Sequence, residues 1–159
     1  MDPFNSLRRV LDKAAVQACL KAGVDGARVE LMNEPFKAPS ISRGREKEAI
    51  YVSFWFRTGG SRQAELGGRR GFEMTVGIYQ FDVMVPEAIG SGPGITIADA
   101  IRREMNRREK LVEPDGHLKL LVSNVKTPFT GPKQGYFQVI CDGALHFYHR
   151  DPNATGFRD

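Results

Sequence analysis

The chain has 159 residues, of which 41% are hydrophobic and 26% are charged, and it carries a net charge of +4. This length fits one domain, and the composition excludes an intrinsically disordered chain. No segment approaches the roughly 18 apolar residues that cross a bilayer, and charges interrupt the N-terminal segment where a signal peptide needs an apolar run. We expect a cytoplasmic protein with one domain over residues 1–150 and a polar C-terminal tail over 151–159.

An amphipathic helix is predicted at the N-terminus. Asp2 is a favourable N-cap, Pro3 suits the first helical position, and Gly23 stands where a C-terminal glycine cap belongs. Between them apolar residues recur at spacings of three and four, the stripe of one helix face: Phe4, Leu7, Leu11, Ala14, Ala18 and Ala22. A short strand over residues 27–32 is expected to follow.

A loop of about fifteen residues is predicted over 33–47, since no periodicity survives there and prolines and glycine interrupt it. Loops of this length inside a compact domain are often functional. This one holds the basic residues Arg43, Arg45 and Lys47.

Two long strands are predicted next. Residues 49–57 alternate, with Tyr51, Ser53, Trp55 and Arg57 on one side, and a turn is expected at 58–61. In residues 72–85 the parity of the apolar positions changes, which predicts a bulge at Gly77.

The second half of the chain predicts one more helix and two more strands. A flexible glycine-rich turn is expected at 90–94, a helix at 97–105, a turn at 114–116, and strands at 118–125 and 136–148. The predicted class is α+β, with a single mostly antiparallel β-sheet and two α-helices packed on it. The periodic apolar positions predict the core: Leu7, Leu11, Val52, Phe54, Phe81, Val83, Ile101, Met105, Val139 and Leu145.

No catalytic residue, metal ligand set or cofactor site is predicted. His146 and His149 are three apart in a predicted strand and so point to opposite faces. The glycine turn lacks the lysine of a P-loop, and Cys19 and Cys141 lie among apolar residues, which is typical of buried thiols. We therefore expect no enzymatic activity.

Basic pairs leave a nucleic-acid-binding module open as an alternative. They occur at Arg69–Arg70, in a predicted loop, and at Arg102–Arg103 and Arg107–Arg108 near the second helix. Nucleic-acid domains combine such arginines with exposed aromatic rings. Here most aromatic residues fall on strand faces that a core would need.

The order of segments resembles the tail terminator-like (tail completion) proteins of tailed bacteriophages. The resemblance covers roughly residues 4–148 and rests on structural rather than catalytic positions. A basic stretch longer than the family pattern precedes Tyr51. The segments that carry the resemblance are Asn33-Glu34-Pro35-Phe36, Tyr51-Val52-Ser53, Arg62-Gln63-Ala64-Glu65-Leu66-Gly67, Phe81-Asp82-Val83-Met84-Val85-Pro86 and Gly135-Tyr136-Phe137-Gln138-Val139.

The resemblance implies a structural virion protein at the head-proximal end of the tail, assembled in the host cytoplasm. Such a protein forms a homo-oligomeric ring, expected to be a hexamer, that caps the tail tube protein, ends tube polymerisation and docks the head through connector or neck proteins. Genomic DNA would pass the lumen and touch it only through phosphates, and no membrane is involved. A head–tail connector or neck protein is the nearest rival. The expected interface residues are Phe36, Arg43, Arg45, Lys47, Trp55, Arg57, Arg69 and Arg70.

Overall fold

The computed structural model describes residues 2–66, 68–128, 134–151 and 153. These residues form two α-helices, six β-strands and four short 3-10 helices. In chain order they are α1 (Pro3–Lys21), η1 (Gly26–Arg28), β1 (Val29–Leu31), η2 (Glu46–Ala49), β2 (Tyr51–Gln63), η3 (Gly68–Arg70), β3 (Glu73–Pro86), η4 (Glu87–Ile89), α2 (Gly92–Met105), β4 (Glu109–Val112), β5 (Gly116–Lys126) and β6 (Tyr136–His149).

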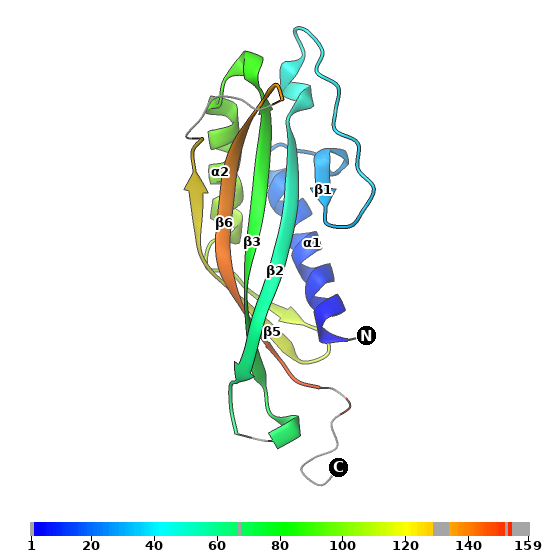
Figure 1. Ribbon diagram of the computed structural model, residues 1–159, viewed down its shortest axis with the longest axis vertical. Helices are drawn as coiled ribbons and strands as arrows, with labels where there is room; N and C mark the ends of the chain where they lie inside the picture. The colour runs from blue at the N-terminus through cyan, green and yellow to red at the C-terminus, as the bar shows by residue number, and fades with distance from the viewer. Residues whose placement is uncertain (1, 67, 129–133, 152, 154–159) are drawn as a thin grey trace.

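The six strands form one curled sheet in the order β1-β2-β3-β6-β5-β4. The pairing of β1 with β2 is parallel, and the other four pairings are antiparallel. Both helices lie on the same face of this sheet, so the fold has two layers (Figure 1). The α+β class is confirmed, with a mixed sheet because β1 runs parallel to its neighbour.

The N-terminal helix begins as the sequence predicts. Asp2 has an extended backbone, and its carboxylate accepts a hydrogen bond from the Asn5 amide at 2.9 Å. This bond satisfies one of the amide groups that a helix start leaves without a partner. Pro3 occupies the first turn, where its missing N–H is not needed.

The core lies between the helix layer and the sheet. All ten residues predicted for it are buried, none more than 2% exposed. Tyr79, Leu118, Leu120 and Phe147 join them from the same face of the sheet. Burial alternates along β6: Val139, Cys141, Gly143, Leu145 and Phe147 are buried, and the residues between them, Ile140, Asp142, Ala144 and His146, are half-buried.

The turn predicted at residues 58–61 is wrong, because β2 continues to Gln63. The two glycines lie in a β-bulge instead, where the register to β3 shifts between Thr58 and Ser61. A bulge takes up such residues without ending the strand. The hairpin therefore closes further on, at residues 64–66 and 68–72.

The bulge predicted at Gly77 is wrong in its strand: it lies in β2, which pairs with this part of β3. β3 pairs with β6 without interruption from Glu73 to Pro86, and the extra residue belongs to β2. Gly77 has a different role: a Cβ there would lie 2.6 Å from the Arg57 carbonyl oxygen. The position needs glycine because two backbones approach closely.

The flexible turn predicted at residues 90–94 is partly wrong, because α2 begins at Gly92. Pro93 lies in its first turn, and Gly94 packs directly on the sheet. The strand β4 was not predicted, since four residues give too short a pattern. The expected turn at 114–116 is confirmed between β4 and β5, and most of the tail predicted over 151–159 lies outside the described residues.

The packing of α1 gives a first prediction. Leu11→Ala removes a fully buried side chain and should lower the free energy of unfolding by about 2–5 kcal/mol. Leu20→Ala is the matched control, because Leu20 lies on the same helix and is 53% exposed. Denaturant titration measures both. A loss for Leu11→Ala no larger than that of the control would contradict the packing of α1 on the core.

The close approach of α2 to the sheet gives a second prediction. At Gly94 an added Cβ would lie 2.5 Å from Val85 Cγ2 and 3.1 Å from Val139 Cγ2, whereas at Gly92 nothing lies within 4 Å. Gly94→Ala should therefore cost about 1–3 kcal/mol through overpacking. Gly92→Ala should be neutral or stabilising, since alanine favours helix. Equal thermal unfolding midpoints for the two variants would refute the close contact.

Candidate subunit interface

One face of the sheet carries no helix (Figure 1). Apolar side chains lie on this open face without being covered: Ile78 is 48% exposed and Val76 is 40% exposed. Trp55 is half-buried there, Arg57 is exposed, and Val122, in the bulge of β5, is 58% exposed. Partly exposed apolar groups on a sheet face are typical of a surface that another molecule covers.

Polar side chains on the open face are mostly paired with one another. The Ser53 hydroxyl donates to Glu30 at 2.5 Å, and the Gln80 amide donates to Asp82 at 2.6 Å. Lys126 and Asp142 form an ion pair at 2.6 Å. These contacts bridge neighbouring residues or strands, while Arg57 stays exposed on the same face.

Residues 32–45 form the long loop, and aromatic rings fix it to the sheet. The Phe36 ring lies 5.5 Å from that of Tyr51, which lies 5.5 Å from that of Tyr136. The Tyr136 hydroxyl also donates to the Pro39 carbonyl at 3.4 Å. Beyond Pro39 the loop is exposed, including Ile41 at 47%.

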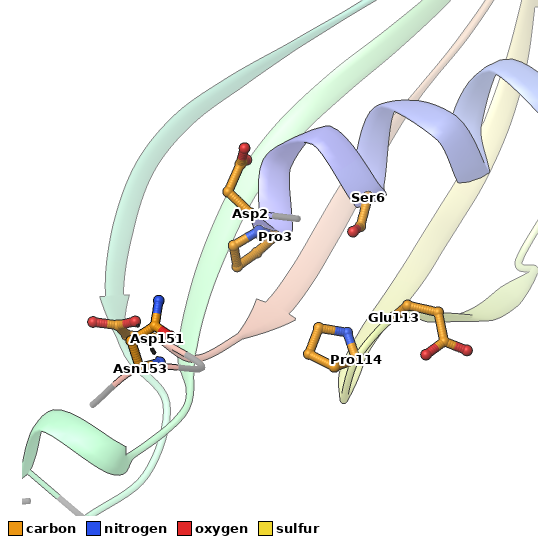
Figure 2. A pocket seen from close by; sticks show the side chains of 7 residues that line it. All are labelled: Asp2, Pro3, Ser6, Glu113, Pro114, Asp151 and Asn153. Carbon is orange, nitrogen blue, oxygen red and sulfur yellow. Dashed lines mark hydrogen bonds between the residues drawn. The ribbon is translucent and has the colours of Figure 1, made fainter. Parts of the chain in front are cut away.

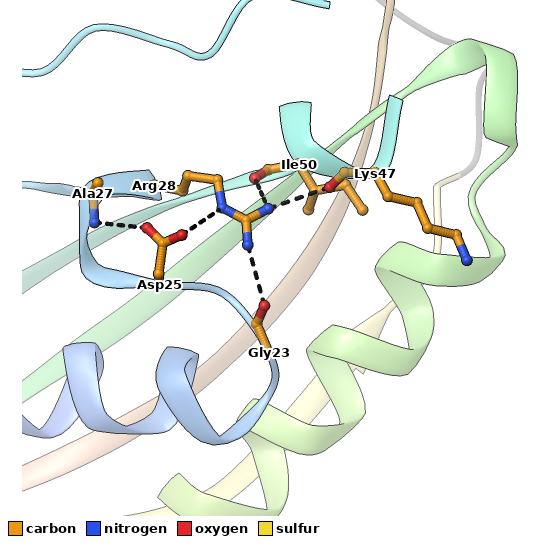
Figure 3. A network of polar contacts seen from close by, with 6 residues as sticks. All are labelled: Gly23, Asp25, Ala27, Arg28, Lys47 and Ile50. Carbon is orange, nitrogen blue, oxygen red and sulfur yellow. Dashed lines mark hydrogen bonds and ion pairs between the residues drawn. The ribbon is translucent and has the colours of Figure 1, made fainter. Parts of the chain in front are cut away.

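Arg28 joins the end of the long loop to the helix layer (Figure 3). Its guanidinium donates to the carbonyls of Gly23, Lys47 and Ile50, each at 3.2 Å, and forms an ion pair with Asp25 at 3.4 Å. A planar guanidinium suits several acceptors at once. This network fixes η2, and with it Lys47, beside the start of β2.

An apolar groove of about 620 Å³ lies next to this network. Val24 and Ile50 belong to the core and also line it, together with Pro93 and Ile97 from α2. Lys47 stands at the same groove and points away from Arg28 (Figure 3). The groove therefore combines an apolar wall with the charged residues Arg28, Lys47 and Glu48.

The hairpin tip, residues 64–66 and 68–72, projects beyond the other strands at the opposite end of the molecule (Figure 1). Leu66 is 93% exposed there, and Arg69 and Arg70 are exposed on η3. A backbone hydrogen bond closes the tip, in which the Ala64 N–H donates to the Phe72 carbonyl at 2.9 Å.

A buried polar cluster lies at the base of the hairpin tip. His149 Nε2 lies 2.8 Å from the Thr75 hydroxyl, which is 2.5 Å from the Ser61 hydroxyl. The imidazole stacks on Phe147 at 4.8 Å and meets the edge of Phe4 at 5.0 Å. Burial lowers the pKa of His149, and the nearby Glu73 charge opposes this shift.

A second depression, of about 470 Å³, lies at the start of α1 (Figure 2). Asp2, Glu113 and Asp151 contribute carboxylates to its lining, and Pro3 and Pro114 contribute apolar surface. Within the described residues, no group of three histidine, cysteine or acidic side chains is arranged to hold a metal ion.

The two cysteines lie in the core. Burial raises the pKa of both the Cys19 and Cys141 thiols to about 12. A thiol with such a pKa stays protonated and unreactive near neutral pH.

In the part of the chain that the structure describes, no helix is long and apolar enough to span a bilayer.

The arginines on α2 and just after it form ion pairs with two carboxylates of the same helix. Arg102 and Arg103 pair with Asp99 at 3.0 and 3.4 Å, and Arg108 pairs with Glu104 at 3.7 Å. A helix that offered these groups to phosphates would first have to break the pairs. Asp99 is shared by two arginines and Glu104 by Lys21 and Arg108, so these pairs reduce the positive charge of this surface without removing it.

The structure separates the predicted interface residues into three places. Arg43, Arg45 and Lys47 lie at the end where the long loop meets η2, while Arg69 and Arg70 lie at the opposite end (Figure 1). Trp55 and Arg57 lie between them on the open face, and Phe36 anchors the loop. Arg45 is engaged with Glu48 at 3.0 Å.

The sequence pattern did not predict Arg28 or the His149 cluster. A single arginine before a short strand carries no periodic signal, and its acceptors are backbone carbonyls up to 22 residues away. The partners of His149 are similarly remote, with Thr75 separated by 74 residues. Leu66 could have been found as a leucine inside a predicted polar loop.

The comparisons with known proteins concern the fold. No family model matches the sequence, and no curated protein matches it. One solved structure aligns with 90% of this chain and 97% of its own, with a TM-score of 0.60 and 16% sequence identity. The similarity shows that the two chains share a fold over almost their full lengths.

The lowered pKa of His149 predicts a dependence of stability on pH. The unfolded chain, with the ordinary value of 6.5, binds a proton at higher pH than the folded chain, so stability should fall as pH decreases through about 6.5 and below. His149→Gln should reduce this dependence, and His146→Gln, on the open face, is the matched control. Urea titrations from pH 8 to 5 measure it. An unchanged pH profile in His149→Gln would show that another group is responsible.

Proposed function

We propose that this chain is a structural virion subunit, the tail terminator of a tailed bacteriophage. In this role a ring of subunits caps the tail tube, ends its polymerisation and offers a docking surface to the head. The ring is expected to be a hexamer. The observation that carries the proposal is the open sheet face, because apolar groups that are exposed together on one sheet face favour a covering neighbour.

The two ends of the molecule support two different axial contacts. The long loop and η2 present Arg43, Arg45 and Lys47 at one end, and the hairpin tip presents Leu66 and Arg70 at the other. A terminator needs such a polarity, since one side of the ring meets the tube and the other meets the connector. Phe36 and Arg28 hold the two ends of the loop in place. A loop held in this way is suited to contact another protein.

The alternative of a nucleic-acid-binding module receives less support. Arg102 and Arg103 on α2 pair with Asp99, Arg108 after this helix pairs with Glu104, and Lys126 on the open face pairs with Asp142. Specific readout requires side chains aimed at base edges. Contact with DNA would then be limited to passage through the ring lumen. Nucleic-acid binding with a steep salt dependence would instead favour the nucleic-acid-binding module over the terminator.

The proposal includes the absence of catalysis and of a bound metal. The basis is the sequence, which contains no nucleophile motif and no ligand spacing. Elemental analysis after dialysis against a chelator tests it. A stoichiometric transition metal that survives this treatment would favour an enzyme instead.

Loss of the gene product in an infected cell distinguishes a terminator from a connector. Without a terminator, tube growth has no stop, so electron micrographs should show tails of irregular and excessive length. Without a connector or neck protein, tails should reach normal length but stay detached from heads. Normal attached tails would contradict both roles.

The long loop gives a prediction about assembly. Deleting residues 40–45 removes an exposed segment beyond the Pro39 anchor, so the subunit should stay folded and its unfolding midpoint should change little. Complementation of a phage that lacks the wild-type gene should nevertheless fail. An infectious yield equal to that of the wild-type gene would show that the loop makes no required contact.

A further inference from the structure

Each border of the sheet contains a strand edge without a neighbouring strand. β1 pairs with β2 only at residues 52–54, so within the described residues no strand lies beside the outer edge of β2 from Trp55 to Gln63. On the other border β4 is the last strand described, and it pairs only with β5. Strand edges of this kind present N–H and C=O groups that another strand can bind.

The part of the β2 edge nearest the hairpin tip lies level with β4 across the sheet. One row of paired residues runs from Leu111 on β4 to Arg62 on β2, through His117, Tyr148 and Met74. A ring with cyclic symmetry rotates each subunit without moving it along the axis. When the strands run along that axis, Leu111 of one copy therefore stands at the height of Arg62 of the next.

On β4 the groups of two residues point away from β5. In an antiparallel ladder, residues that bond to their partner alternate with residues whose N–H and C=O groups point outward. The Leu120 N–H donates to the Arg108 carbonyl at 2.7 Å, at the start of the ladder between β4 and β5. By alternation, the N–H and C=O groups of Glu109 and Leu111 point outward.

The same alternation applies to β2. The Ala64 N–H donates to the Phe72 carbonyl at 2.9 Å, at the end of the ladder between β2 and β3. The backbone groups of Arg62 are therefore used within the ladder, and those of Ser61 and Gln63 point outward.

The outward groups of the two edges match. β2, β6 and β4 run in one direction and β3 and β5 in the other, so copies placed side by side would bring β4 and β2 together in parallel. In a parallel ladder an outward residue bonds to the two residues that flank its opposite. Ser61 is level with Lys110, so its N–H would donate to the Glu109 carbonyl and its carbonyl would accept from the Leu111 N–H.

The border of β2 leaves room for such a strand. β1 covers β2 at residues 52–54 and also runs parallel to it, whereas the matching stretch of β2 lies at 60–63. A neighbour's β4 would therefore occupy the line of β1, further along β2, without overlapping it. β2 would then have one parallel partner from its own chain and one from the next.

Side chains at the two edges are complementary. Leu111 is 83% exposed, and it shares a row on the open face with Met74, which is buried, and Arg62, which is exposed. Pairing would place Leu111 against the Arg62 side chain of the neighbour. Glu109 is exposed two residues before Leu111 on the same face, within reach of the Arg62 guanidinium for an ion pair.

From these observations we infer that copies of this chain associate through unlike edges of the sheet, with β4 residues 109–112 of one copy pairing in parallel with β2 residues 60–63 of the next. The sheet then continues from subunit to subunit around the ring. This inference rests on the proposed function for the closure of the ring. Its rival is that α1, which lies beside β4, and the bulge before Ser61 keep other chains away, as in monomeric sheet proteins.

Paired cysteines test the inference on the full-length protein. Arg62→Cys with Leu111→Cys places one exposed thiol on each edge, in the same row of the open face. Under a mild oxidant or a short bismaleimide, this double variant should give a ladder of covalent multimers on a denaturing gel, ending at the ring size. Cys19 and Cys141 are buried and should not contribute.

Control variants separate this pairing from other contacts. Arg62→Cys with Lys13→Cys, where Lys13 is exposed on α1, should give no ladder. Covalent dimers as the main product of Arg62→Cys alone, or of Leu111→Cys alone, would indicate like edges paired about a two-fold axis and overturn the inference.

A proline substitution tests the backbone pairing without cross-linking. Gln63→Pro removes an N–H that points away from β3, so the subunit should stay folded, while the neighbour's Leu111 carbonyl loses its donor. Gln63→Ala is the matched control, because it removes the same side chain and keeps the N–H. Sedimentation should show association weakened roughly tenfold in Gln63→Pro relative to Gln63→Ala. Equal association of two variants with equal unfolding midpoints would overturn the pairing.

The pairing and the proposed function fail separately. A wild-type protein that sediments as a monomer, in which the cysteine pair gives no ladder, would overturn the edge pairing, and so would a ring without cross-links. Tails of uncontrolled length in the absence of the gene product would then leave the terminator role standing, with a different interface. A ladder from the cysteine pair together with normal attached tails would keep the edge pairing and overturn the terminator role.

Discussion

The fold depends on the pairing between β3 and β6, which runs without interruption over the 14 residues of each strand. The neighbouring elements pack against or pair with these two strands. β2 and β5 pair with its two outer edges, and α2 packs across its inner face, where Gly94 lets the helix approach Val85 and Val139. The ladder also places His149 beside Thr75, so the base of the hairpin tip belongs to the same unit.

The helices cover the sheet on one side only, and this asymmetry is the feature on which the proposed function rests. Two helices bury the inner face, while the outer face keeps Ile78, Val76 and Val122 in contact with water. Isolated exposed apolar residues are ordinary in monomers, but here they share the face of the sheet that no helix covers. The surface is better suited to a protein neighbour than to a small ligand.

Basic residues that look alike in the sequence have different roles in the structure. Arg28 binds three backbone carbonyls and holds η2 in place. Arg102 and Arg103 neutralise Asp99 within one helix. Arg43 and Arg70 are exposed at opposite ends of the molecule. A net positive charge therefore says little about binding until each group has been placed.

The sequence by itself determined the elements whose patterns are long and local. The apolar stripe of α1, the alternation of β2 and β6, and the ten core positions follow from periodicity, because burial of one face repeats at 3.6 or 2 residues. The α+β class follows from their order.

Only the tertiary structure decided what depends on distant partners. The glycines at 59 and 60 became a bulge because β3 lay alongside to hold the strand, and Gly92 to Gly94 became helical because α2 packs on the sheet. The separation of Arg43 from Arg70, and the open edge of β2 after Phe54, depend on which strands become neighbours. Local sequence cannot fix these features, because their energies arise between residues far apart in the chain.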